Sequence, residues 1–185
     1  MVLHMDTAAI EGLRLEVGAE VVIRAVNADD APMLQAFVRG LSVRSRRFRF
    51  FSALVELSAA QLDRLVRPDR FGLALVALSG RSEDAAIVGE ARYVVDPAAV
   101  RDAEFAIAIA DEFQRKGLGT RLMKLIVAHA SRTGVRRLFG EILAENQTML
   151  EFARRLGFGV RANAADHRTM IACSSAATMT STVAS

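Results

Sequence analysis

The sequence is poor in cysteine, since only Cys173 carries a thiol among 185 residues. No disulfide can therefore form within the chain, and a zinc site built on a cluster of cysteines is excluded. Long apolar runs are missing too, because no stretch reaches the roughly 18 residues that span a bilayer. The N-terminus has no basic stretch followed by an apolar core, which is the pattern of a secretory signal. We therefore expect a soluble cytoplasmic protein without a membrane partner.

Lysine is also scarce, since the chain has 2 lysines against 22 arginines. Arginine pairs with phosphates and carboxylates in planar forks, and it also forms ordinary surface ion pairs with acidic residues, of which there are 21. A nucleic-acid-binding protein clusters its positive charge on one face. Only residues 44–49 come close to that pattern, and the interleaved Phe48, Phe50 and Phe51 indicate a half-buried helix or turn. The charge pattern argues against a nucleic-acid partner, and the sequence leaves the oligomeric state open.

The apolar residues, 52% of the chain, predict one folded domain at 11–174, between a loose N-terminus at 1–10 and a loose C-terminal tail at 175–185. Alternating apolar residues predict strands, and apolar stripes with capping residues predict helices. The predicted strands cover 13–17, 21–25, 72–78, 86–95, 104–110, 137–143, 158–160 and 169–173. One predicted helix begins near Pro32 and is capped by Asn27 or Asp29, and another begins after Ser58. Three more predicted helices cover 44–51, 117–133 and 147–156. This order predicts an α+β domain built on a mixed sheet.

A glycine-containing segment, Gln114-Arg115-Lys116-Gly117-Leu118-Gly119-Thr120, joins a predicted apolar strand to a predicted amphipathic helix. The first turn of a helix leaves backbone N–H groups unpaired, and the helix dipole favours an anion there. Glycine lets a phosphate approach the backbone because no Cβ stands in the way. The spacing is neither a dinucleotide-binding fingerprint nor a Walker loop. Taken alone, a single Gly-x-Gly leaves an ordinary strand-to-helix turn as the favoured interpretation.

The spacing Gln-x-x-Gly-x-Gly after a strand resembles the acyl-CoA pyrophosphate loop of the GNAT N-acetyltransferases. The flanking segments 103–111, 143–150 and 156–158 resemble the family's central strand, its strand-to-helix segment and its closing helix end. The likeness covers about residues 20–173. It implies a single GNAT-type α+β domain, whose sheet is mixed, mostly antiparallel, splayed between the family's strands 4 and 5, and flanked by helices.

Further segments carry a narrower resemblance. They are Arg39-Gly40-Leu41-Ser42, Arg49-Phe50-Phe51-Ser52, Leu57-Ser58, 74–78, 87–93 and 140–146. Together they resemble the acetyltransferase domain of bacterial Pat-type protein-lysine acetyltransferases, which modify acyl-CoA synthetases. Pat-type proteins usually carry a second regulatory or synthetase-like domain, for which we expect no room in 185 residues. The resemblance implies an acetyl-CoA-dependent N-acetyltransferase and leaves its regulation open.

Acetyl transfer to an amine needs a neutral nucleophile, yet only about one lysine in a thousand is neutral at pH 7.4. A carboxylate can take the proton from the amine. The resemblance implies a catalytic glutamate at the start of the strand that leads into the loop, and Glu104 matches that position. Glu104 opens an apolar strand that could raise its pKa, and the alternative is a solvated acid at a strand end. Glu141 is a weaker candidate base, since Arg136 or Arg137 could pair with it.

Acetyl-CoA is the cosubstrate that the resemblance implies, and no metal site is predicted. Its pyrophosphate is expected at the backbone of Gln114, Arg115, Lys116, Gly117, Leu118, Gly119 and Thr120. Its pantetheine arm is expected to pair with backbone groups of Ala108, Ile109 and Ala110, because an opened sheet edge offers unpaired N–H and C=O groups. Asn146 could bond the pantetheine, cap the next helix, or do both.

The sequence leaves three functions open. The leading one is an enzyme that acetylates a protein lysine by direct attack, with Glu104 as general base. The second is the same chemistry on a small amine, such as a polyamine, an aminoglycoside or an amino acid. The third is a non-catalytic acyl-CoA-binding sensor. Contacts to the acceptor are expected mainly from the helices near residues 32–66.

Other side chains are weaker candidates. Many GNAT enzymes offer a tyrosine general acid on the helix after the splay, but helix 147–156 has none, and Tyr93 lies on an earlier strand. Either the acid is missing or solvent reprotonates the thiolate. His129 continues the apolar spacing of its helix and is predicted at the edge of the core, and Cys173 reads as a small core residue.

Overall fold

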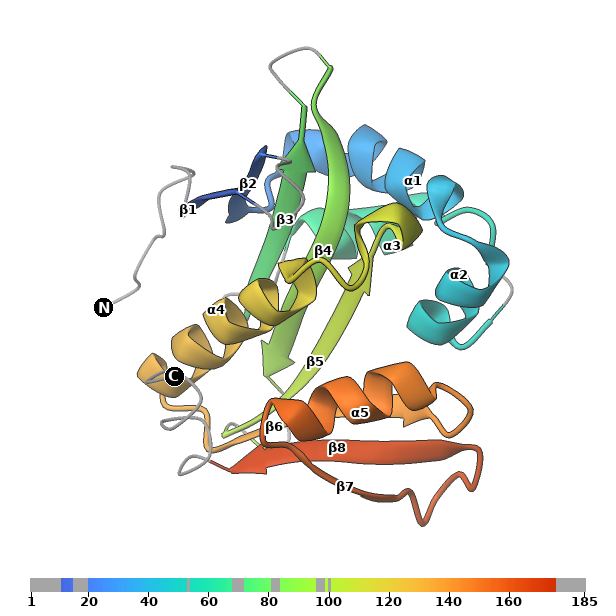
Figure 1. Ribbon diagram of the computed structural model, residues 1–185, viewed down its shortest axis with the longest axis vertical. Coiled ribbons are helices and arrows are strands. Elements are labelled where there is room, and N and C mark those ends of the chain that lie inside the picture. Colours follow the sequence, from blue (N-terminus) through green and yellow to red (C-terminus); the bar gives the residue numbers. More distant parts are fainter. Residues whose placement is uncertain are drawn as a thin grey trace.

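The computed structural model describes residues 11–14, 20–52, 54–67, 72–80, 84–95, 99 and 101–175. The loose segments predicted at 1–10 and 175–185 lie outside these residues, except that Ser175 ends the last strand. The strand predicted at 13–17 lies partly outside them as well. Within the described residues, helices and strands follow one another in the predicted order (Figure 1).

Eight strands in the described part of the chain form one mixed sheet, in the order β1-β2-β3-β4-β5-β6-β8-β7 (Figure 1). They are β1 (Glu11–Arg14), β2 (Glu20–Ala25), β3 (Leu73–Ser79), β4 (Ala86–Val95), β5 (Asp102–Ile109), β6 (Arg137–Leu143), β7 (Gly159–Ala162) and β8 (Thr169–Ser175). Neighbouring strands pair antiparallel except β5 and β6, which run parallel. The predicted mixed, mostly antiparallel sheet is confirmed.

The sheet opens between β5 and β6. Their parallel pairing covers only residues 102–104 with 137–139, after which the two strands diverge (Figure 1). Beyond that point β5 continues as the partner of β4, and β6 continues as the partner of β8. The two edges that face each other across the opening therefore have no strand partner there. This is the predicted splay.

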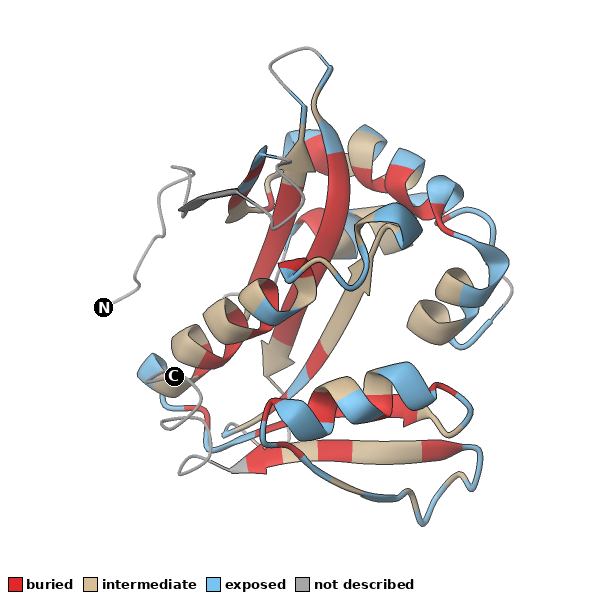
Figure 2. Ribbon diagram, in the orientation of Figure 1, coloured by how far each residue is buried: buried red, intermediate tan, exposed pale blue. Residues whose placement is uncertain are grey.

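Helices cover both faces of the sheet. They are α1 (Ala31–Gly40), α2 (Val43–Phe50), α3 (Ala59–Val66), α4 (Leu118–Arg132) and α5 (Gln147–Arg155). Leu73 and Leu75 of β3 belong to the core with α4, whereas Ala74 and Val76 belong to the core with α1 and α3. Because successive side chains of a strand point to opposite faces, α4 lies on one face of the sheet and α1 and α3 on the other. Figure 2 shows the buried positions concentrated along β3 and β4.

The start of α1 differs from the prediction. Asn27 does not cap α1 but caps the 3-10 turn η1 (Ala28–Asp30), where its side chain accepts from Asp29 N–H at 2.9 Å. The helix α1 begins at the next residue, with Asp30 in the N-cap position. The Asp30 carboxylate makes no capping bond there because it binds the Arg24 guanidinium at 2.6 and 2.7 Å. Asn27 thus caps the turn that leads directly into α1, and Asp30 Oδ2 accepts from Asn27 N–H at 2.8 Å to complete a capping box. No helix within the described ranges is long and apolar enough to cross a bilayer.

Candidate active site

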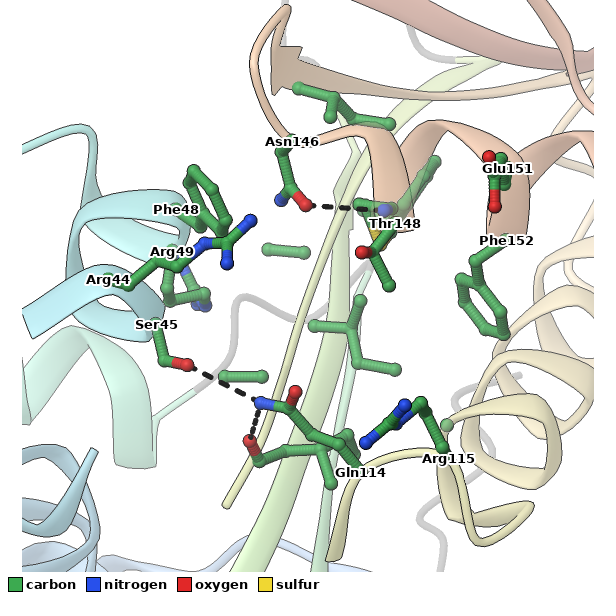
Figure 3. Close-up of a pocket in the computed structure, with 18 of the residues that line it drawn as sticks. Arg44, Ser45, Phe48, Arg49, Gln114, Arg115, Asn146, Thr148, Glu151 and Phe152 are labelled. Carbon is green, nitrogen blue, oxygen red and sulfur yellow. Dashed lines mark hydrogen bonds between the residues drawn. The ribbon is translucent and has the colours of Figure 1, made fainter. Parts of the chain in front are cut away.

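A cleft of about 990 Å³ lies where β5 and β6 diverge (Figure 3). It is lined by α2, β5, the segment that leads into α4, part of β6, and α5. Most of the residues predicted for the site line this cleft, namely Glu104, Ala108, Ile109, Gln114, Arg115, Gly117, Gly119, Thr120 and Asn146. Segments far apart in the sequence therefore meet at the opening of the sheet.

The segment 114–120 has the backbone geometry of an anion site. Gly117 occupies the N-cap position of α4 with φ +86°, a left-handed conformation that favours glycine. Among the described residues no side chain caps this end of α4, so its first N–H groups keep their capacity for a ligand. The dipole of α4 and the Arg115 side chain, which projects toward the cleft in Figure 3, favour an anionic group there.

Two residues of this segment direct their side chains elsewhere. Leu118 is fully buried in the core under α4. The Lys116 ammonium lies over the ring of Phe113, 5.5 Å from its centroid. Neither residue lines the cleft. Leu118 and Lys116 can therefore take part in the predicted phosphate site only through their backbone N–H groups.

The backbone of β5 differs from the prediction at two of three positions. Ala110 donates its N–H to Val88 O at 2.9 Å and accepts from Phe113 N–H at 2.8 Å, so its backbone is already paired. Hydrogen-bonding direction alternates along an antiparallel strand, so Ala108 also turns its backbone groups to β4. The prediction that Ala108 and Ala110 pair with the pantetheine arm is therefore wrong. The register between β5 and β4 decides which residues of β5 turn their backbone groups to the opening.

Ile107 and Ile109 present their backbone to the opening, because they alternate with the residues that pair with β4. Of the three positions predicted to bind the pantetheine arm, Ile109 turns its backbone to the opening. Ile107 also does so, and the sequence did not predict it. The Ile109 carbonyl accepts a hydrogen bond from Gln114 Nε2 at 3.1 Å (Figure 3). Gln114 Nε2 also lies 3.4 Å from Ser45 Oγ, which links this edge to α2.

Glu104 lies at the apex of the opening, as the last residue of β5 that pairs with β6, opposite Phe139. Glu141 lies two residues further along β6 on the same face, and both glutamates line the cleft. Burial raises the pKa of Glu104, the Glu141 carboxylate raises it further, and the Arg49 guanidinium partly offsets both. A raised pKa brings a carboxylate closer to the range in which a general base works.

Glu141 is not held by the arginines that the sequence offers as partners. Arg137 pairs instead with Asp102, and no ion pair within the described residues includes Glu141. The Glu141 carboxylate accepts a hydrogen bond from Asn163 Nδ2 at 2.9 Å. Its negative charge is therefore available to a cation that enters the cleft.

Arg49 reaches the cleft from α2 and is anchored in a buried ion cluster. Its Nη2 lies 3.2 Å from Glu90 Oε2, and Glu90 also binds Arg92 Nε. Arg92 donates in turn to the carbonyl of Leu65 at 3.0 Å. Burial opposes the ionisation of Glu90, but the two arginines outweigh it and hold its pKa below the usual value. The cluster ties the C-terminal part of α2 to β4.

Asn146 caps α5, which is one of the two roles predicted for it, and the bond to the pantetheine stays a prediction. Its Oδ1 accepts from Met149 N–H at 3.2 Å and caps α5, while the residue also lines the cleft (Figure 3). Its Nδ2 has no hydrogen-bond partner within the described residues and is available to a ligand. The cap orients the side chain, which is an advantage for binding.

The remaining candidates belong to the core or lie away from the cleft. Tyr93 is fully buried on the α4 side, and its hydroxyl lies 2.8 Å from His129 Nδ1 and 3.0 Å from Thr133 Oγ1. The prediction of His129 as a core-edge residue is consistent with this network. Burial raises the pKa of the Cys173 thiol. Within the described residues, no group of three or more acidic, histidine or cysteine side chains could hold a metal.

The helix α2 supplies cleft residues that the sequence did not assign to the site. They are Arg44, Ser45, Phe48 and Arg49, together with Phe51 just after the helix. The Arg- and Phe-rich run 44–51 was visible in the sequence and correctly predicts a half-buried helix. Its composition does not reveal that the helix lies beside β5, because that contact joins residues far apart in the chain.

The family model described as "Acetyltransferase (GNAT) family" matches residues 39–158. An acetyltransferase of Pseudomonas aeruginosa is 33% identical over 156 residues, which cover 82% of this chain and 83% of that protein. The GNAT domain of S. lividans PAT has a TM-score of 0.79 and 24% identity, covering 89% of this chain and 96% of that one. The structure of yncA from Salmonella typhimurium with its cofactor acetyl-CoA has a TM-score of 0.66 and 16% identity, covering 84% and 94%.

The two structural likenesses show a shared fold, and the family model and the Pseudomonas relative show the family. They agree with the splayed sheet and with the glycine-containing loop at the start of α4. The resemblance drawn from the sequence is confirmed. This chain belongs to the acetyltransferase (GNAT) family and is an acetyl-CoA-dependent acyltransferase.

Proposed function

We propose that this protein transfers the acetyl group of acetyl-CoA to the side-chain amine of a protein lysine, with Glu104 as general base. The layout of the cleft carries the proposal. An anion-binding loop lies at one end, and a partly buried carboxylate lies at the apex of the sheet opening. The β5 strand from Glu104 toward the loop is roughly 20 Å long at the usual rise of an extended strand. The long, thin pantetheine arm of CoA suits that separation.

The residues in the cleft fit the pyrophosphate and the pantetheine arm of acetyl-CoA. The N–H groups at the start of α4 and the Arg115 guanidinium suit the pyrophosphate. The open backbone groups of Ile107 and Ile109 and the Nδ2 of Asn146 suit the amides of the arm. Acetyl-CoA supplies the activated acetyl group, and the chain supplies position, charge and a proton acceptor.

Glu104 performs the chemical role that the acceptor requires. A lysine arrives as an ammonium, and the two carboxylates of Glu104 and Glu141 attract it. Glu104 then takes a proton from the nitrogen, which becomes nucleophilic. A backbone N–H on the open edge of β5 stabilises the negative charge that develops on the carbonyl oxygen. The helix α5 has no tyrosine, so solvent returns the proton to the departing thiolate.

Exposed apolar side chains beside the cleft favour a protein as the acceptor. Val43, Phe51 and Val55 are 64%, 45% and 59% exposed, and all three belong to α2 or the segment after it. Phe51 also lines the cleft. Binding of a protein surface would remove these side chains from water, whereas a small amine would leave most of them exposed.

The charge of the cleft argues against a polyamine as the acceptor. A polyamine pocket needs a clear excess of acidic side chains. Here the lining contains both signs, with Arg44, Arg49, Arg115 and Arg155 beside Glu104, Asp111, Glu141 and Glu151. This balance suits a single ammonium next to an anionic cosubstrate.

The experiment is a screen of CoA release with purified acyl-CoA synthetases, polyamines and aminoglycosides, followed by mass spectrometry of the acetylated product. Glu104→Gln keeps the shape but removes the proton acceptor, and should lower turnover about 10²–10⁴-fold. Acetyl-CoA affinity should change little, and high pH should partly rescue the variant because more amine is already neutral. Glu151→Gln removes another cleft carboxylate and serves as the matched control.

Two results would contradict the proposal. Near-normal turnover of Glu104→Gln at neutral pH would exclude Glu104 as the base and direct attention to Glu141. Acetylation of a polyamine or an aminoglycoside, with none of any protein lysine, would support the small-amine alternative. Calorimetry with acetyl-CoA must accompany the kinetics, because a loss of binding would instead indicate a structural role for Glu104.

A further inference from the structure

The helix α2 forms one wall of the cleft although little hydrophobic packing holds it, since among its residues Phe50 alone packs against the core beside α1 and α3. None of its residues is buried, whereas α1 and α4 both bury apolar side chains in the core. Helices in proteins are usually stabilised by the packing of an apolar face. The position of α2 therefore depends largely on polar contacts.

Three polar contacts from the N-terminal end of α2 are made to one carboxylate, that of Asp111. Ser42 N–H donates to Asp111 Oδ2 at 2.9 Å, and Ser42 Oγ donates to Asp111 Oδ1 at 2.9 Å. Ser45 Oγ donates to Asp111 Oδ1 at 2.7 Å. Burial opposes the ionisation of Asp111, but these hydrogen bonds outweigh it and hold its pKa below the usual value. A negative charge at this end of α2 also suits the helix dipole.

Asp111 is at the same time the first residue of the segment that leads into the acetyl-CoA loop. It opens the 3-10 turn η3 (Asp111–Phe113), and its carbonyl accepts from Gln114 N–H at 3.4 Å. The Gln114 side chain in turn joins Ser45 Oγ to the Ile109 carbonyl (Figure 3). One short segment therefore holds α2 and shapes the phosphate end of the cleft.

We propose that Asp111 is a positioning residue that sets α2 against the acetyl-CoA loop and so couples the binding of acetyl-CoA to the binding of the acceptor. The inference rests on the proposed function for the role of α2 toward the acceptor. Phe48 and Arg49 enter the cleft about one turn after Ser45, so a shift of the anchored end moves them. Coupling between two binding sites is reciprocal, so each substrate favours the binding of the other.

Amide hydrogen exchange tests the anchor without an acceptor. Asp111→Ala should raise the exchange rate of residues 43–50 about tenfold or more, which corresponds to the loss of a hydrogen bond to a charged group. The amides of α4 should keep their rates. Acetyl-CoA should slow exchange at 43–50 in the wild type and have much less effect in the variant. Glu112→Ala removes the neighbouring carboxylate of the same turn and should behave like the wild type.

Kinetics with Nα-acetyl-lysine amide as the acceptor separate positioning from loss of cosubstrate binding. Asp111→Ala should lower kcat/KM for this acceptor about tenfold, with a smaller change in acetyl-CoA affinity. Asp111→Asn keeps the shape and should give an intermediate loss. The double variant Asp111→Ala/Ser45→Ala should be only slightly worse than Asp111→Ala, because both substitutions break the Ser45–Asp111 hydrogen bond and Ser45→Ala adds only the loss of the longer contact with Gln114.

The proposal fails if exchange at 43–50 is unchanged in Asp111→Ala, or if the effects of Asp111→Ala and Ser45→Ala simply add. It also fails if Glu112→Ala matches Asp111→Ala. Normal turnover of Glu104→Gln would refute the proposed function instead, and the exchange experiment would still decide whether Asp111 anchors α2.

Discussion

Replacement of Gly119 by alanine should stabilise the fold and weaken acetyl-CoA binding. Gly119 lies in the first turn of α4 and is not among the glycines with positive φ. A Cβ at this position would lie 3.6 Å from Phe152, 3.8 Å from Ile109 and 3.9 Å from Ile107, all ordinary contact distances. These three side chains line the cleft. The added methyl group would therefore fit the protein but project into the space that acetyl-CoA needs.

The two effects have opposite signs and separate magnitudes. Alanine in place of glycine stabilises a helix by about 0.5–1 kcal/mol, because the unfolded chain loses conformational freedom. For a domain of this size, each kcal/mol raises Tm by roughly 2–4 °C. Loss of one hydrogen bond between a backbone N–H and a phosphate costs about 1.5–3 kcal/mol. The Kd for acetyl-CoA should therefore rise roughly 10- to 150-fold.

Thermal unfolding of the ligand-free protein measures the first effect, and calorimetry with acetyl-CoA measures the second. Gly117→Ala is the matched control for the stability measurement, because a Cβ there meets nothing within 4 Å while φ is +86°. The control should lose about 1–2 kcal/mol of stability through backbone strain alone. An unchanged acetyl-CoA affinity in Gly119→Ala would refute the pyrophosphate site at this loop. A Tm of Gly119→Ala below that of the wild type would refute the local geometry described for α4.

Two further predictions concern stability. A Cβ at Gly140 would lie 2.8 and 2.9 Å from atoms of the Phe105 ring. Gly140→Ala should therefore lower the free energy of unfolding, measured by urea titration, by about 1–3 kcal/mol. An unchanged urea midpoint would contradict this packing. Burial lowers the pKa of His129, and the positive charge of Arg132 lowers it further. Below about pH 6.5, His129 therefore binds a proton in the unfolded chain that it does not bind in the folded chain. Stability should therefore fall as pH drops from 7 to 5, and His129→Gln should flatten this dependence; an equal slope in both proteins would exclude His129 as the cause.

Much of the local structure could be predicted from the sequence because its signals act over a few residues. The predicted strands 86–95 and 137–143 coincide with β4 and β6, and the predicted helix 44–51 is α2 shifted by one residue. Period-two alternation, turn residues and capping side chains operate between near neighbours, so a single sequence contains them. The glycine-containing loop at the start of α4 is local in the same way.

The orientation of β5 could not be predicted this way. Whether Ala108 or Ile109 turns its backbone to the opening depends on the register of β5 with β4. A shift of one residue would exchange the residues that pair with β4 and the residues that face the opening. The sequence of β5 is apolar at both kinds of position and contains no sign of that register. The error at Ala108 and Ala110 has this origin.

Sequence alone thus determined the order of the elements, the α+β class and the glycine-containing loop at the start of α4, and it proposed Glu104 as the base, because each depends on near neighbours or on a recognisable motif. Only the tertiary structure decided that Glu141 lies close enough to Glu104 to raise its pKa, that Arg49 is bound by Glu90 beside them, and that Asp111 accepts hydrogen bonds from Ser42 and Ser45 at the start of α2. Asp111 and Ser45 are 66 residues apart. Contacts over such separations depend on how β5, β6 and α2 pack together, and that packing follows from the summed burial of the whole chain rather than from any local pattern.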